Sequence, residues 1–91
     1  MTIISKLFEQ HLPSQSPSSD TFWGYALPLI EKLQKDGVSF FFKSDGERDT
    51  DIYTVMIEGA PLNGDFFKTE TDELESGIEK VISEYAMDYW N

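Results

Sequence analysis

Four carboxylates alternate along one short polar segment, a spacing that could present oxygen ligands to a divalent cation. They are Asp45, Glu47, Asp49 and Asp51. Calcium-binding loops of the EF-hand kind place a glycine at the sixth position and a bidentate glutamate at the twelfth. Counted from Asp45, these two positions hold Thr50 and Met56 instead. We therefore predict a solvated loop tip, with no bound metal ion and no cofactor.

Other residue types that commonly carry catalysis are scarce. His11 is the single histidine, and the chain contains no cysteine. A catalytic triad needs a nucleophile and an orienting acid beside the histidine, and nothing in the sequence marks such partners. The lack of cysteine excludes disulfides, thiolate zinc sites and iron–sulfur clusters. We expect no catalytic residue and no enzyme activity; an enzyme or metal site built on carboxylates is the least favoured alternative.

Negative charge is concentrated in the second half of the chain. The net charge is −10, and the first 44 residues contain as many lysines as acids. Such a surface repels phosphate backbones and anionic membranes, so we expect neither nucleic acid nor a membrane as partner. A basic protein is the natural complement. The residues predicted to bind it are the four loop acids and one flank of the last predicted helix: Asp72, Glu75 and Glu79.

The N-terminal part of the chain is predicted to form a helix and a linker that precede the main domain. Residues 1–12 have apolar side chains at helical spacing, with Thr2 as a capping residue, and form a short amphipathic helix. Residues 13–19 are polar and contain two prolines, which is typical of an extended or mobile linker. Residues 20–91 then form a single domain.

A second helix is predicted to begin at Asp20 and to end before Gly37. Asp20 is a suitable N-cap, and Gly37 suits the left-handed conformation that often follows a helix. Pro28 lies inside this helix and lacks the N–H that would bond to the carbonyl of Gly24. We expect either a kink at Pro28 or a short helix followed by another that restarts there.

Strands are predicted after the second helix because the apolar period changes from helical spacing to two. They cover residues 38–43, 51–58 and 65–69, with glycine-containing turns between them. A final helix follows, with Asp72 as N-cap and Glu75 completing a capping box. Its apolar stripe consists of Leu74, Ile78, Val81, Ile82, Tyr85 and Tyr89.

These elements predict an α+β fold. An N-terminal helix and linker precede an α-β-β-β-α unit, in which a three-stranded antiparallel meander packs against helices. From the second helix onward this order resembles the double-stranded-RNA-binding domain, including the turn entered at Ile57-Glu58-Gly59. That family carries a basic cluster at the start of its last helix, where this chain has residues 71–75 with three acids. The resemblance therefore implies a topology, and RNA binding is not carried over.

One face of the predicted sheet is half apolar and needs a cover. Residues 40–42 are three consecutive phenylalanines, so large rings lie on both sides of the first strand. If two helices cover one face, the other presents Phe41, Ile52 and Met56. We expect the N-terminal helix to fold over this second face. A protein partner or a second copy of the chain is the alternative cover.

We expect this sequence to encode a small acidic protein-binding domain without enzyme activity. Its function would be that of an inhibitor or immunity-type protein that neutralises a basic nuclease or nucleic-acid-binding partner. A structural or regulatory subunit, or a homodimer that docks through the half-apolar sheet face, is the alternative. No apolar run approaches the roughly 18 residues of a membrane span, and the N-terminus does not resemble a secretory signal, so a cytoplasmic location is expected.

Overall fold

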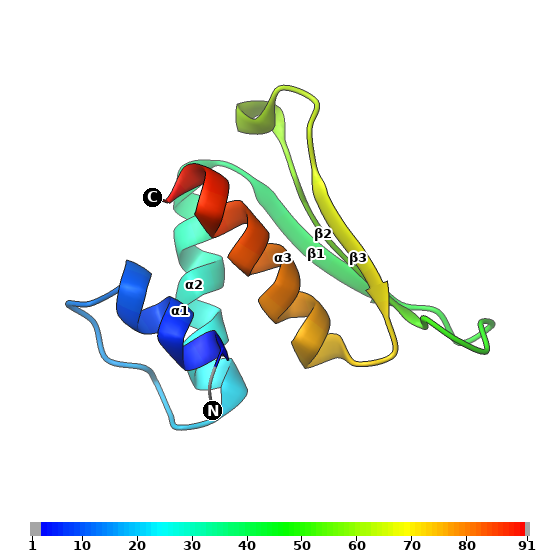
Figure 1. Cartoon of the computed structure of the whole chain (residues 1–91), viewed down its shortest axis with the longest axis horizontal. Helices are drawn as coiled ribbons and strands as arrows, with labels where there is room; N and C mark the ends of the chain where they lie inside the picture. Colours follow the sequence, from blue (N-terminus) through cyan, green and yellow to red (C-terminus); the bar gives the residue numbers. More distant parts are fainter. Residues whose placement is uncertain (1–2, 91) are drawn as a thin grey trace.

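The structure is a computed structural model that describes residues 3–90. It has three α-helices and one three-stranded sheet, which confirms the predicted α+β class and order of elements (Figure 1). In chain order they are α1 (Ile3–His11), α2 (Phe22–Asp36), β1 (Ser39–Ser44), β2 (Tyr53–Glu58), β3 (Phe67–Thr71) and α3 (Leu74–Tyr89), with a short 3₁₀ turn, Ala60–Leu62, before β3. Thr2, the predicted cap of the first helix, lies outside the described residues. No helix within residues 3–90 has the length and apolar character needed to cross a membrane.

The sheet is an antiparallel meander with β2 in the centre. Val55 and Ile57 of β2 are completely buried and face the helices. The alternate residue Met56 lies on the opposite face, here called the outer face, with Phe41 and Lys68 directly beside it on the neighbouring strands. The register therefore sorts the apolar residues of β2 toward one layer of helices.

Two helices form that layer. Helix α3 packs along β2 and β3, and the end of α2 reaches β1, so both lie on the same face of the sheet (Figure 1). The stripe predicted for the last helix explains this contact, because Ile78, Val81, Ile82 and Tyr85 are buried. Gly77 brings the two layers close together, since a Cβ there would lie 2.8 Å from Thr71 Cγ2.

Helix α1 packs on α2 and α3, so the prediction that it covers the outer face of the sheet is wrong. Its apolar residues Ile4, Leu7 and Phe8 are buried against the other two helices. The amide of Ile4 also donates to the Glu79 carboxylate of α3 at 3.1 Å. The helical layer offered α1 both an apolar surface and a partner for its N-terminus, and the outer face stays uncovered within the described chain.

The linker repairs the defect that Pro28 makes in α2. Helix α2 runs from Phe22 to Asp36 without a break, so a second helix restarting near Pro28 is excluded. The carbonyl of Gly24, which Pro28 cannot reach with an N–H, instead accepts a hydrogen bond from the amide of Ser18 at 3.2 Å. The loop therefore completes the helix from outside.

The ends of α2 differ in how well they were predicted. Thr21, and not Asp20, is the N-cap, because its hydroxyl accepts from the amide of Gly24 at 3.2 Å. Gly37 follows the helix with φ of 88°, which confirms the predicted left-handed residue.

Candidate functional site

The sheet register brings two acidic segments to one end of the molecule. Tyr53 lies opposite Ser44 on one side and Thr71 on the other, so the β1–β2 loop and the turn before α3 emerge from the same end of the sheet (Figure 1). We call residues 45–51 and 70–75 the acidic end. Its two segments contain eight carboxylates and a single cation, Arg48. Negative charge therefore dominates this end.

Arg48 organises the loop. Its Nη1 donates to the carboxylate of Glu70 at 3.2 Å and to the carbonyl of Asp51 at 3.1 Å, and its Nε lies 3.4 Å from the Asp45 carboxylate. Asp45 also accepts the amide of Glu47 at 3.0 Å. Asp51 has φ of 53°, in the left-handed region that aspartate tolerates better than most residues. Asp45, Asp51 and Glu70 thus shape the loop as well as charging it.

Asp72 ties the second segment to the first. Its carboxylate accepts the amide of Ile52 at 3.4 Å, so Asp72 bridges to the start of β2. The predicted cap at Asp72 is wrong, because Glu73 occupies the N-cap position and makes no side-chain capping bond. Without that cap there is no capping box, and Glu75 is left exposed in the first turn of α3.

Three carboxylates of the acidic end have no structural partner. Within residues 3–90 the side chains of Glu47, Asp49 and Glu75 make no hydrogen bond or ion pair, and all three residues are exposed. In the same part of the chain, no group of three His, Cys, Asp or Glu side chains is placed to hold a metal ion. What these carboxylates can do is attract positive charge through solvent.

Glu79 does not belong to this end. It lies one helical turn beyond Glu75, is half-buried, and binds the amide of Ile4 near the N-terminus of α1. Six of the seven acids predicted as partner-binding are therefore brought together, and Glu79 instead holds two helices together.

The predicted apolar docking residues share the outer face of the sheet. Phe41 is 43% exposed and pairs with Met56, and Ile52 lies just before β2 on the same face. Phe66, which is 56% exposed, was missed. The sequence could have indicated it, because Phe66 and Phe67 are adjacent. Neighbouring residues of an extended chain point to opposite faces, so the helices can cover only one of these two rings.

A second charged cluster lies where α1, α2 and the end of α3 meet. We call His11, Lys32, Asp36, Tyr85 and Trp90 the aromatic end. Asp36 accepts hydrogen bonds from Tyr85 Oη at 2.8 Å and from Trp90 Nε1 at 2.7 Å. The ammonium of Lys32 lies 5.1 Å from the centre of the Trp90 ring, and the His11 ring packs against the same indole at 5.2 Å. Lys32 and Asp36 are spaced four apart, which places both on one face of α2.

Two groups of the aromatic end have shifted pKa values. Burial, reinforced by the hydrogen bond to Asp36, raises the pKa of Tyr85 above its ordinary value. Burial, followed by the nearby Lys32 charge, lowers the pKa of His11. Both shifts favour the neutral form, of the tyrosine and of the histidine.

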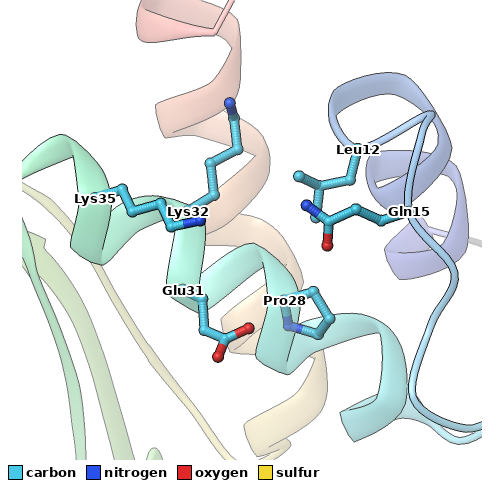
Figure 2. A pocket seen from close by; sticks show the side chains of 6 residues that line it. All are labelled: Leu12, Gln15, Pro28, Glu31, Lys32 and Lys35. Atoms are coloured by element: carbon cyan, nitrogen blue, oxygen red, sulfur yellow. The ribbon is translucent and has the colours of Figure 1, made fainter.

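The hollow beside this cluster is small and polar. It has a volume of about 190 Å³. Figure 2 shows its lining side chains between the linker and α2. Its lining residues are Leu12, Gln15, Pro28, Glu31, Lys32 and Lys35. It is smaller than the roughly 300–1,000 Å³ of typical ligand sites and mixes opposite charges at its rim. The acidic end is therefore the stronger candidate site.

Comparison with known protein families, with curated proteins and with solved structures found no match to this chain.

Proposed function

We propose that this chain is a non-enzymatic, acidic protein-binding domain that captures a basic protein surface through its acidic end. A partner that itself binds nucleic acid, such as a nuclease, has the complementary charge, so an inhibitor or immunity-type role follows. The observation that carries the proposal is the convergence of two acidic segments, distant in sequence, at one end of the sheet.

The electrostatic repulsion among the acids supports this proposal. Like charges held on a compact surface repel one another, and a small domain needs a net charge of only about 2–8 for solubility. The chain carries −10, and three carboxylates at the acidic end support no contact within the described residues. A cationic partner would convert this repulsion into attraction and would be steered toward the site over a distance of about 10 Å at 0.1 M salt.

Two charge-reversal variants test the proposal. The acidic-end variant combines Glu47→Lys, Asp49→Lys and Glu75→Lys. The remote variant combines Glu9→Lys, Glu84→Lys and Asp88→Lys, all exposed residues of α1 and the second half of α3. Both variants change the formal charge by the same amount, so net charge alone cannot explain a difference between them.

Each immobilised protein is incubated with lysate of the native cell at about 50 mM and about 500 mM salt, and the retained proteins are identified. We expect the wild-type chain and the remote variant to retain the same basic protein at low salt only. The acidic-end variant is expected to lose it. Equal retention by both variants, or retention that does not depend on salt, would contradict the proposal.

Docking through the outer face of the sheet is the second candidate function. It is favoured by the placement of α1 on the helices, which leaves the exposed rings of Phe41 and Phe66 uncovered. Apolar docking is insensitive to salt. A partner that stays bound at about 500 mM salt and is lost in Phe66→Lys would support this function instead of the first.

A further inference from the structure

Strand β1 forms one edge of the sheet and exposes aromatic rings on both of its faces. Phe41 lies on the outer face and Phe42 on the helix face, because their partners on β2 are Met56 and the buried Val55. The two rings are 43% and 42% exposed. A ligand on either face alone would cover one of them. A strand added along the edge covers both, because its own side chains alternate between the faces.

The two edges of the sheet are not alike. Edge strand β3 alternates charged residues, Lys68 and Glu70, with the residues that pack under α3, a pattern that discourages pairing with another strand. Strand β1 reads Ser-Phe-Phe-Phe-Lys-Ser and has no proline, and its only charge, Lys43, lies near its end. It lacks most of the features that keep an edge strand unpaired.

A hollow on the helix face lies beside this edge. It has a volume of about 200 Å³ and is lined by Ile30 and Gln34 of α2 together with Val38 and Phe40. A cavity of roughly 150 Å³ suffices for a benzene ring. The hollow can therefore accept an aromatic side chain that arrives opposite Phe40.

We propose that two copies of this chain pair through β1 in antiparallel orientation, with Phe41 of one copy opposite Phe41 of the other. A two-fold axis perpendicular to the sheet then continues it to six strands and keeps the helices of both copies on one side. In this register Phe40 lies opposite Phe42 of the second copy, whose ring enters the hollow. Lys43 lies opposite Ser39. Centring the pair on Phe42 instead would place Phe41 opposite Lys43 and Phe40 opposite Ser44, which leaves two rings of each copy without aromatic partners.

The two acidic ends lie far apart in this dimer, so most of the repulsion between the copies is screened by salt. The acidic end follows the C-terminal end of β1, so antiparallel pairing directs the two acidic ends away from each other. Six residues of strand span about 20 Å, which exceeds the screening length of about 8 Å at physiological ionic strength. The strand pair is smaller than a standard interface of about 1,200–2,000 Å², so we expect dissociation constants of about 10 μM or weaker.

Sedimentation equilibrium from about 1 μM to about 500 μM measures the association. The variants Phe41→Lys and Phe42→Lys are expected to raise the dissociation constant at least tenfold, although they lower the net charge that would repel a second copy. Phe66→Lys is the matched control, an exposed ring outside β1, and should dimerise like the wild type. A monomeric wild type at all concentrations, or a Phe41→Lys variant that dimerises unchanged, overturns the proposal.

Single-cysteine variants test the register, because the chain contains no native cysteine. Directly opposite residues have Cβ atoms about 4.5–5.5 Å apart, close to disulfide distance, whereas diagonal residues are about 7–8 Å apart. Under mild oxidation Phe41→Cys is expected to cross-link and Phe42→Cys is not. Cross-linking through Phe42→Cys without Phe41→Cys overturns the register. Circular dichroism confirms that each variant is folded.

Discussion

Charged side chains have different surroundings at the two ends of this molecule. At the aromatic end, Asp36 accepts two hydrogen bonds and Lys32 lies over the Trp90 ring, so each charge supports a contact between elements. At the acidic end, Glu47 and Asp49 support no such contact within residues 3–90. Charges that hold a fold together can therefore be told apart by their contacts from charges that support no contact, although their residue types are the same.

The largest expected loss of stability comes from the buried contact between α3 and the sheet, and the losses at the two ends are compared with it. Ile78 is completely buried, and Ile78→Ala removes three methyl or methylene groups and leaves a cavity. We expect the free energy of unfolding to fall by about 2–5 kcal/mol. Urea denaturation of this variant and of Leu27→Ala, a half-exposed control on α2, measures the difference. A similar small loss in both variants would mean that α3 does not form the core contact described above.

The aromatic end is expected to lose stability when its acceptor is removed. Asp36→Ala leaves Tyr85 Oη and Trp90 Nε1 without their hydrogen-bond partner. We expect a loss of about 1–3 kcal/mol in the free energy of unfolding. The matched change at the acidic end, Asp49→Ala, is expected to alter it by less than about 0.5 kcal/mol. Equal losses would remove the distinction between the two ends.

Two glutamates one turn apart on α3 sharpen the same comparison. Glu79 accepts the amide of Ile4, whereas the side chain of Glu75 has no partner within residues 3–90. Glu79→Lys is expected to cost about 1 kcal/mol, because it removes a carboxylate from the N-terminus of α1 and places a cation there. Glu75→Lys is expected to leave the urea midpoint unchanged. If Glu79→Lys is also neutral, α1 is not held by this contact.

The smallest expected effect concerns His11 and pH. Burial and Lys32 lower the pKa of His11 in the folded state, so the unfolded chain binds the proton first as the pH falls. Stability contributed by the neutral ring is present above the unfolded pKa and is lost below it. Between about pH 7.5 and pH 5.5, the melting temperature of the wild type should fall relative to that of His11→Gln. A difference that stays constant over this range would show that His11 is not coupled to folding.

The sequence predicted the parts of the fold that depend on local periodicity. The stripe of α3 was predicted, and Ile78 and Val81 are buried as expected, because six residues at helical spacing allow only one buried face. Tyr89, predicted in the same stripe, remains exposed at the end of the helix, where it stacks on Tyr85. Periodicity identifies the face of a helix, and the length of the surface beneath it decides where burial ends.

The position of α1 could not be predicted from the same information. An amphipathic helix requires an apolar surface, and both the helical layer and the outer face of the sheet offered one. The choice depends on long-range partners such as Glu79, 75 residues from Ile4 in the sequence. The sequence likewise predicted two acidic groups, the loop acids and the helix acids, but not that they lie at one end of the sheet. Their proximity depends on the strand register, which brings Asp72 to the loop.

The central claim, that the exposed carboxylates Glu47, Asp49 and Glu75 of the acidic end act on a partner and not on the fold, is tested most directly by association kinetics. The rate constant for binding of the captured basic protein is measured for the wild type, the acidic-end variant and the remote variant from about 50 mM to about 500 mM salt. Steering by the acidic end predicts at least a tenfold slower association for the acidic-end variant at low salt, with the difference vanishing at high salt and the urea midpoint unchanged. Equal association rates for the two variants at low salt would contradict the claim.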